Sequence, residues 1–541
     1  MTNVKFSKAE IEKHFKMSEE MEEKINLLGA PIEEITSEEI ILDVLPNRPD
    51  LLSFRGWLRA FRAFTGKEPG LKEYIVHKPE KEYLVKIHAS TKNIRPYTAC
   101  AIIKSLSLDD EKIREIIDIQ EKLHLTLGRN RKKIAIGIYP LEKITLPITF
   151  LALNPSEIKF RPLDGDKEMT GREILERHPT GKEYAHLLSN KEKFPVFKDA
   201  AGKILSMPPI VNSHETGKIA SSTKEIFIEC SGFDLKTLKK TLNILVTTFA
   251  EMKGEIYAME LDYGKKEITP NLKPERMKLS IEKANKLLGL SLKEKEIGIL
   301  LSKMGYRYKN KNVEIPPWRV DILHEVDLIE DIAIAYGYDN FTPENPQIAT
   351  MGEELPESRI KSKIAELLIG LECIEISTYH LIKSEESKLM KTEAIEVENS
   401  KTEYKILRPS LLIPALRVLA ENKDAEYPQK IFEIGKVFNR NADEETGVQE
   451  TSHLLIAVTP GNFTSIKQIV DYCSKNLGLQ LGIKKSAKPE FIEGRTAGIL
   501  LHEKEIGCMG ELHPQTLRNW NLKMPVAVME ISIEEIIKAL S

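Results

Sequence analysis

The sequence predicts a multidomain α+β protein, and three observations support this fold class. The chain has 541 residues, which at roughly 150 residues per domain is enough for three or four domains. Helical and strand-like patterns are both common, but they do not alternate as strict βαβ units. Proline-containing stretches at 268–277 and 341–358 have the composition of linkers. The predicted domains are residues 1–80, 81–268, 269–343 and 355–541.

The composition is that of an ordinary globular protein. Hydrophobic residues make up 41% and charged residues 30%, which excludes collagen-like, mucin-like and largely disordered chains. The 79 basic and 82 acidic residues nearly cancel. The chain as a whole is therefore not a basic nucleic-acid-binding protein, although a local basic patch is compatible with this balance.

The cysteines and the apolar segments indicate the cellular compartment in which the protein is expected. The five cysteines lie far apart without a CxxC pair, which argues against a zinc ribbon and a disulfide framework and favours a reducing cytosol. The first residues lack the apolar core of a signal peptide, and no run of about 18 apolar residues occurs. We therefore expect a cytoplasmic protein with no membrane span.

The first domain begins with a charged helical stretch over 6–29. Residues 38–45 alternate as in a strand, and the two prolines of 46–50 exclude a helix there. An amphipathic helix over 51–66 follows and ends at Gly66. The second domain adds helices over 109–128 and 234–254. Its predicted strands are 83–89, 98–106, 133–139, 148–153, 225–232 and 255–261.

The third domain is compact, with two helices expected within 283–310 and a helix over 324–337. Between them, 312–322 reads as a strand broken by two prolines. The last domain begins with a helical apolar stripe within 360–371. Its predicted strands are 374–382, 430–438, 453–459, 497–503, 505–512 and 525–532.

The sharpest candidate site is an acidic segment. Asp327, Glu330 and Asp331 fall at i, i+3 and i+4, so a helix places them on one face. Asp321 lies six residues before Asp327. Carboxylates this close repel one another unless they are neutralised, and Mg²⁺ would do so through oxygen ligands. Acidic residues in a first helical turn also interact favourably with the helix dipole, and spacing alone favours that explanation.

Two further segments hold polar groups. The loop PPIVNSHETG carries donors and acceptors from Asn212 to Thr216, which could line a polar pocket or form an ordinary turn. The segment LHLTLGRNRKK carries Arg129, Arg131, Lys132 and Lys133, with His124 and Tyr139 nearby. Contact with phosphate is one interpretation, and a solvated loop is the other. No Walker A loop, GxGxxG, GxSxG or HExxH motif is present.

Three segments together resemble the β subunit of phenylalanyl-tRNA synthetase in its archaeal and eukaryotic form. They are LPNRPDLLSFRGWLRAFRAFTG, LHLTLGRNRKKIAIGIY and IPPWRVDILHEVDLIEDIAIAYGY. The segments MPPIVNSHETGKI, KIFEIGKVF and IGCMGELHPQTL resemble the same family in the same order. The resemblance therefore covers nearly the whole chain.

The resemblance implies an enzyme of two α and two β chains. The α chain would attach phenylalanine to tRNA(Phe) with ATP as substrate. The β chain would contribute to assembly and tRNA binding and would hydrolyse tRNA mischarged with tyrosine. The central domain would be of the editing type and the third small and winged-helix-like. The last would be an antiparallel-sheet domain similar to class II synthetases.

The sequence of the last domain also indicates that it has lost the catalytic motifs of class II synthetases. Class II synthetases follow the corresponding strand with Arg, one residue and Glu, whereas here Phe438 is followed by Asn439, Arg440 and Asn441. Because the Arg is displaced and the acid is absent, we expect no triphosphate clamp. We interpret the domain as a scaffold for the α subunit. A free-standing tRNA-binding or deacylating protein is the alternative, and a self-sufficient synthetase is disfavoured.

The resemblance also assigns residues. The Mg²⁺-binding position of the family is matched by Asp321, Asp327, Glu330 and Asp331. The resemblance therefore favours Mg²⁺ binding over the helix dipole as the explanation of this acidic segment. The implied editing pocket holds Leu205, Asn212, Ser213, Glu215 and Asp234. A group that pairs with the tyrosine hydroxyl would select tyrosine, because phenylalanine would leave it unpaired. Asp234 is the expected acceptor and Ser213 a donor, with a positioned water as the nucleophile.

Overall fold

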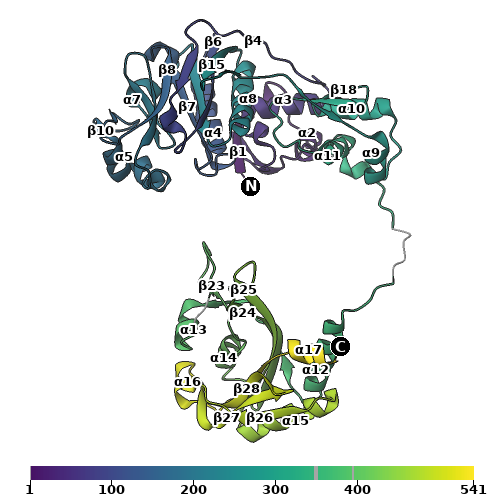
Figure 1. The fold of residues 1–541 in the computed structure, drawn as a ribbon. Coiled ribbons are helices and arrows are strands. Elements are labelled where there is room, and N and C mark those ends of the chain that lie inside the picture. The colour runs from purple at the N-terminus through teal and green to yellow at the C-terminus, as the bar shows by residue number, and fades with distance from the viewer. Residues whose placement is uncertain (1, 346–350, 393–394, 541) are drawn as a thin grey trace. The chain divides into compact units, whose positions relative to one another are not determined.

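A computed structural model describes residues 2–345, 351–392 and 395–540 of the chain. It divides into two compact units, Met1–Asn345 and Pro346–Ser541 (Figure 1). Within the described residues, no helix has the length and apolar character that crossing a membrane requires.

The first domain is built on a three-stranded antiparallel sheet in the order β1-β3-β2. The strands are β1 (Thr2–Ser7), β2 (Ile32–Ile35) and β3 (Glu39–Val44). The single helix expected over 6–29 is instead two, α1 (Lys8–Glu12) and α2 (Glu19–Leu27). Ser7 and Ser18 explain the difference, because the side chain of each accepts a hydrogen bond from a backbone N–H at the start of a helix.

The amphipathic helix of this domain is α3 (Phe54–Phe64), as expected. Ser53 caps its N-terminus by accepting a hydrogen bond from the backbone N–H of Gly56. Trp57 and Phe61 are fully buried and stack with ring centroids 4.9 Å apart. Gly66, with φ +76°, supplies the left-handed residue just beyond the helix.

The central domain contains an 11-stranded mixed sheet whose main path is β13-β12-β11-β8-β5-β15-β6-β14-β7. The sheet divides at β15, which pairs with β6 through Glu255–Ala258 and with β5 through Glu260–Asp262. The strands are β4 (Val76–His77), β5 (Leu84–Ile87), β6 (Tyr97–Lys104), β7 (Ile134–Pro140), β8 (Ile148–Leu153), β11 (Phe194–Lys198), β12 (Ile204–Met207), β13 (Val211–Asn212), β14 (Ile226–Gly232), β15 (Glu255–Asp262) and β16 (Lys266–Thr269).

Helices α4 (Asp110–Leu125) and α8 (Leu235–Glu251) match the two long helices expected from the sequence. Ile228 and Cys230 of β14 pack into the same hydrophobic cluster as residues of α4 and α8. Phe227 points to the other face and joins a second cluster with Tyr139 and Leu205. Smaller elements complete the domain: β9 (Lys159–Phe160), β10 (Met169–Thr170), α5 (Gly171–Arg177), α6 (Pro179–Tyr184) and α7 (His214–Gly217).

The third domain has three helices and a three-stranded antiparallel sheet in the order β17-β19-β18. Its elements are β17 (Glu275–Lys278), α9 (Ile281–Leu288), α10 (Glu294–Lys303), β18 (Arg307–Lys309), β19 (Asn312–Ile315) and α11 (Glu325–Tyr336). One hydrophobic cluster runs from Val4 through Phe249 to Ala335. The first three domains therefore share a continuous core and form one unit.

The second unit is organised around a seven-stranded sheet in the order β20-β24-β25-β29-β28-β27-β26. The strands are β20 (Ile374–Glu375), β24 (Gln429–Arg440), β25 (Val448–Thr459), β26 (Leu481–Lys485), β27 (Phe491–Leu501), β28 (Lys504–Leu512) and β29 (Ala527–Ser532). All neighbouring pairs of this sheet are antiparallel except β20 and β24. The strand expected over 374–382 is split, because its last residues belong to a separate sheet of β21 (Leu381–Lys383), β22 (Ile395–Glu396) and β23 (Tyr404–Leu407).

Helices cover both faces of this sheet (Figure 1). One hydrophobic cluster holds buried residues of α12 (Pro356–Ile369), α15 (Phe463–Leu477) and α17 (Glu534–Leu540). The other holds Leu412 to Leu419 of α14 (Leu412–Glu421) on the opposite face. The short helices α13 (Ser384–Leu389) and α16 (Pro514–Asn519) complete the unit.

Candidate functional site

A cavity of about 130 Å³ opens in the central domain beside β7, which ends the main path of the sheet. Its walls come from segments far apart in the sequence. The end of α4 supplies Glu121 and His124, and the loop after it supplies Arg131. Asn212 comes from β13 and Glu229 from the middle of β14. The cavity is therefore lined mainly by polar and charged groups that the fold brings together.

Glu229 has the most unusual environment of these residues. Its neighbours in β14 are all buried, and it is itself only 1% exposed. Burial raises the pKa of Glu229 to about 8, although Arg95 and a hydrogen bond from Tyr139 act to lower it. Its Oε2 atom has no hydrogen-bond partner among the described residues. Glu229 thus supplies the cavity with a protonatable group that still needs a polar partner.

Tyr139 and Gly137 of β7 shape the space next to Glu229. The Tyr139 hydroxyl lies 2.8 Å from Ser206 Oγ, 3.3 Å from Glu229 Oε1 and 3.4 Å from Asn212 Oδ1. Gly137 pairs with Glu229 across the sheet. A Cβ atom at position 137 would lie 2.1 Å from the Tyr139 hydroxyl oxygen and 2.6 Å from Glu229 Oε1. A glycine is needed there because any side chain would crowd this carboxyl group.

The rim of the cavity is fixed by an ion pair. Arg131 donates hydrogen bonds to both carboxylate oxygens of Glu121, at 3.0 and 3.1 Å, and to the carbonyl oxygen of Ile210 at 2.9 Å. Burial acts to raise the pKa of Glu121, but hydrogen bonds from His124 and Arg131 lower it to about 2. Glu121 is therefore ionised and joins α4 to the loop after β12 through Arg131.

His124 is held in one tautomer. Its Nε2 accepts a hydrogen bond from the backbone N–H of Ile136 at 2.8 Å. Its Nδ1 lies 3.3 Å from a carboxylate oxygen of Glu121. Because Nε2 is an acceptor, the proton of the neutral ring belongs on Nδ1. Burial lowers the pKa of His124, so this side chain supports the cavity wall and neither ring nitrogen is free to act as a base.

Asn212 is the one predicted editing residue that lines this cavity. Leu205 is fully buried in the core, where its carbonyl oxygen accepts a hydrogen bond from the Ser213 N–H at 2.7 Å. Ser213 is buried and precedes α7, and Glu215 is exposed. These three residues support or flank the loop and do not contribute to the cavity lining.

Asp234 lies elsewhere, at the N-terminus of α8. Its Oδ2 accepts hydrogen bonds from the backbone N–H and the hydroxyl of Thr237, and these bonds lower the pKa of Asp234. Asp234 lines a different groove, together with Arg129, Lys133 and Phe233. The structure therefore does not bring Asp234 together with Asn212 in this cavity, which Glu229 lines instead.

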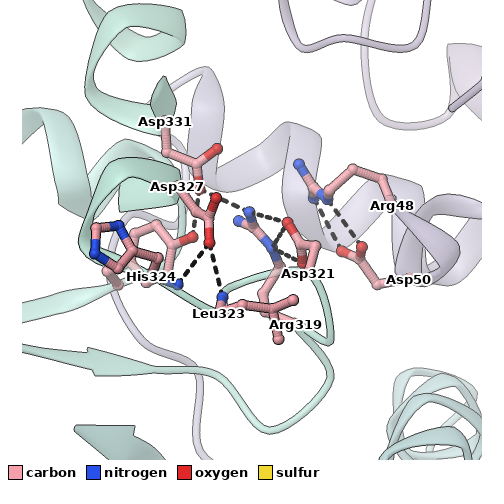
Figure 2. Close-up of polar contacts among 9 residues, drawn as sticks. Arg48, Asp50, Arg319, Asp321, Leu323, His324, Asp327 and Asp331 are labelled. Atoms are coloured by element: carbon pink, nitrogen blue, oxygen red, sulfur yellow. Dashed lines mark hydrogen bonds and ion pairs between the residues drawn. The ribbon is translucent and has the colours of Figure 1, made fainter. Parts of the chain in front are cut away.

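The acidic segment near α11 is organised by Arg319 (Figure 2). Its Nη2 lies 2.7 Å from an oxygen of Asp321 and 2.7 Å from an oxygen of Asp331. All three side chains are almost fully buried, and Tyr306 donates a further hydrogen bond to Asp331. A second buried pair, Arg48 with Asp50, lies beside this cluster (Figure 2).

The other two acidic residues have different environments. Asp327 accepts hydrogen bonds from the backbone N–H groups of Leu323 and His324, both at 2.7 Å, and so caps α11. Glu330 is exposed. Among the residues that the structure describes, no three His, Cys, Asp or Glu side chains converge as a metal site. The predicted ligands do not fit Mg²⁺ in this arrangement, since Arg319 already neutralises two of them.

The buried arginine of the second unit is likewise paired with a carboxylate. Arg408, 1% exposed, lies 2.8 Å from Glu433 and also donates to the hydroxyl of Thr378 at 2.6 Å. Arg440 is exposed at the last position of β24, opposite Val448. The buried arginine is bound within the protein, and the displaced one has no Glu two residues later. Neither arrangement provides a triphosphate clamp.

Known families match along the chain. A model described as the B3/4 domain matches residues 82–250, and one described as the tRNA synthetase B5 domain matches residues 277–338. A third, the phenylalanyl tRNA synthetase beta chain CLM domain, matches residues 342–533. The cavity beside β7 lies in the first of these ranges, and the acidic segment lies in the second.

Whole-chain relatives give the same result. The phenylalanine–tRNA ligase beta subunit of Pyrococcus abyssi is 38% identical over 90% of this chain and 89% of its own length. That of Methanocaldococcus jannaschii is 37% identical over 99% of this chain and all of its own. A crystal structure of an N-terminal fragment of the phenylalanyl-tRNA synthetase beta subunit from Pyrococcus horikoshii, 36% identical, covers 62% of this chain with a TM-score of 0.59. The chain therefore belongs to the family of phenylalanine–tRNA ligase β subunits.

Proposed function

We propose that the cavity beside β7 is an editing site that hydrolyses tRNA(Phe) mischarged with tyrosine. The observation that carries the proposal is Glu229, a buried carboxyl group that lines the cavity and has one oxygen without a hydrogen-bond partner. A buried polar group without a partner loses roughly 1–3 kcal/mol relative to a paired one. A ligand that supplies the missing partner is therefore preferred.

Tyrosine and phenylalanine differ by the one group that Glu229 can recognise. The tyrosine hydroxyl can pair with the carboxyl group, whereas phenylalanine would leave it unpaired and cover it with an apolar ring. Gly137 leaves room for the Tyr139 hydroxyl next to Glu229. This cavity is suited to the rejection of tyrosine after attachment, when the synthetic site has already accepted it.

The hydrolysis itself is proposed to use a positioned water. Among the residues that line the cavity there is no serine or cysteine, and both nitrogens of His124 are engaged. A serine or cysteine nucleophile with His124 as its base is therefore not supported. The polar wall formed by Arg131, Glu121 and Asn212 can orient the ester and a water molecule.

Deacylation by the assembled enzyme tests the proposal. The complex with the authentic α subunit should release tyrosine from Tyr-tRNA(Phe) faster than phenylalanine from Phe-tRNA(Phe). Glu229→Leu should reduce this preference roughly 10- to 100-fold, whereas Glu229→Gln, which keeps a polar amide, should retain part of it. Gly137→Val should displace the Tyr139 hydroxyl and the Glu229 carboxyl group and slow release of tyrosine. An unchanged preference in Glu229→Leu would remove Glu229 from the site.

We further propose that the second unit binds the α subunit and that ATP acts at the α subunit's synthetic site, in an assembly of two α and two β chains. The paired state of Arg408 and the displaced position of Arg440 support this division of labour. Co-expression followed by aminoacylation tests it. The chain should co-purify with the α subunit, and activity should require both. A chain that stays alone, or that activates phenylalanine unaided, would contradict the proposal.

A further inference from the structure

The basic loop after α4 presents cations that the proposed editing chemistry does not use. Arg129, Lys132 and Lys133 are exposed, and their side chains have no ion pair within the described parts of the chain. Arg131 differs, because it is bound to Glu121 and to the carbonyl of Ile210. The loop therefore contains one arginine, Arg131, that is held at the cavity rim, and three exposed cations without an ion pair among the described residues.

An exposed aromatic ring lies in the same groove as two of these cations. A groove of about 650 Å³ is lined by Arg129, Lys133 and Phe233. Phe233 is 53% exposed, an unusual state for so large an apolar side chain. The guanidinium of Arg95 lies 5.5 Å from the centre of its ring. A ring supported by a cation and open to solvent beside free cations is the combination that binds single-stranded nucleic acid.

The groove and the editing cavity share the same loop. Residues 126–134 contribute to the groove through Arg129 and Lys133 and to the cavity through Arg131. One short segment thus lines both the groove and the cavity. The carboxylate in the groove lining, Asp234, is already bound to Thr237. The same lining holds two cations, Arg129 and Lys133, so its net formal charge is positive.

We propose that this groove binds the single-stranded 3′ end of the tRNA and leads it into the editing cavity. The inference rests on the proposed editing function, because it assigns the surface through which that substrate enters. Arg129 and Lys133 contact backbone phosphates, and a base near the 3′ end stacks on Phe233. Arg131 marks the point where the strand crosses from the groove to the cavity.

Binding of uncharged RNA tests the groove independently of editing. The probe is an RNA hairpin with the acceptor-stem sequence of tRNA(Phe), made with and without its single-stranded 3′ end. Its affinity for the complex with the α subunit is measured at several salt concentrations. Arg129→Asn with Lys133→Gln removes two charges, and asparagine tolerates the positive φ of 47° at position 129. Phe233→Ala removes the stacking surface, and Phe233→Trp keeps it.

The expected results distinguish contact with the single-stranded 3′ end from contact with the duplex. With the 3′ end present, Phe233→Ala should weaken binding about tenfold, and Phe233→Trp should not. The double charge variant should weaken binding and lower the salt slope by about 0.7 for each lost phosphate contact. Neither change should affect the hairpin without its 3′ end. Lys224→Gln, an exposed lysine just before the other end of β14, is the matched control and should bind both hairpins normally.

Two results would overturn the proposal. Equal loss of binding for both hairpins would mean that the loop contacts the duplex, and unchanged binding of both would mean that the groove does not bind RNA. The proposal for the editing cavity can be wrong while the proposal for the groove is right. This is the case if Glu229→Leu leaves the tyrosine preference intact and the groove variants lose RNA binding.

Discussion

At the scale of single residues, burial determines the role of each charge. Arg408 and Arg319 are buried and each has carboxylate partners, so they stabilise the fold. Glu229 is equally buried, but it forms no ion pair with any described residue, and its Oε2 has no hydrogen-bond partner there. The lack of an ion-pair partner distinguishes Glu229 from these structural charges, and it can be recognised in the structure without reference to any relative.

The pH dependence of stability follows from the same carboxyl group. Burial raises the pKa of Glu229 from its ordinary value of 4.5 to about 8, so between these values the folded chain holds a proton that the unfolded chain releases. The contribution of Glu229 to the free energy of unfolding is therefore nearly complete at about pH 5. It is lost as the pH rises to about 8, by up to about 1.4 kcal/mol per pH unit. Urea unfolding of wild type and Glu229→Gln should show that the variant has the shallower pH slope.

Glu115 adds to this slope, because burial raises its pKa to about 7. Its contribution is present in both proteins and cancels in the comparison. Identical slopes for wild type and Glu229→Gln between pH 5 and pH 8.5 would show that Glu229 does not hold the proton in the folded chain.

The sequence could predict part of the site. Asn212 was found because it stands in a polar loop, and Arg131 lies in the basic segment that was noted. Glu229 was missed, although an acidic residue inside the apolar run IFIECSG was a usable signal. Asp234 was predicted as the acceptor but lines a different groove, because the sequence gives the ends of β14 and α8 but not which side chains the fold brings into one cavity.

At the scale of elements, the segments with a strong pattern were predicted well. Helices α3, α4, α8 and α11 match amphipathic stretches. Strand β1 was missed because its alternating Val4 and Phe6 are only two apolar residues in a short polar segment. The elements between 158 and 200 were not predicted, since they are short and pack through contacts distant in sequence. Patterns of three or four residues carry too little periodicity to be recognised.

The start of α11 provides a test at this scale. Asp327 accepts two backbone N–H groups that would otherwise lack partners, so Asp327→Ala should lower the free energy of unfolding of the first unit by about 1 kcal/mol. The loss should be the same in Mg²⁺ and in EDTA if capping is the role of Asp327. If Mg²⁺ stabilises wild type but not the variant, the segment is a metal site in solution, as the sequence resemblance predicts.

At the scale of the whole molecule, the chain consists of two units whose hydrophobic clusters are separate. One cluster joins the first three domains, and two others lie within the second unit. The linker was visible in the sequence as a proline-containing stretch. The fusion of the first three domains into one unit was not visible, because it depends on tertiary contacts such as Arg59 stacking 4.0 Å from the ring of Trp318.

Separate cores predict separate unfolding transitions. Arg319→Met leaves buried Asp321 and Asp331 without their cation and should destabilise the first unit by about 3–5 kcal/mol. Arg408→Met leaves buried Glu433 unpaired and should destabilise the second unit by a similar amount. Each variant should shift one of two transitions in a urea titration. A single transition that both variants shift equally would contradict the division into two units.

The most direct test of the central claim compares two non-hydrolysable analogues of the 3′ end, one carrying tyrosine and one carrying phenylalanine in amide linkage. Calorimetry is performed on the α/β complex after the synthetic site is saturated with an unreactive phenylalanyl-adenylate analogue. The account predicts that the tyrosine analogue binds at least about tenfold more tightly and that Glu229→Leu abolishes the difference. Equal affinities in wild type, or a preference that survives in Glu229→Leu, would contradict it.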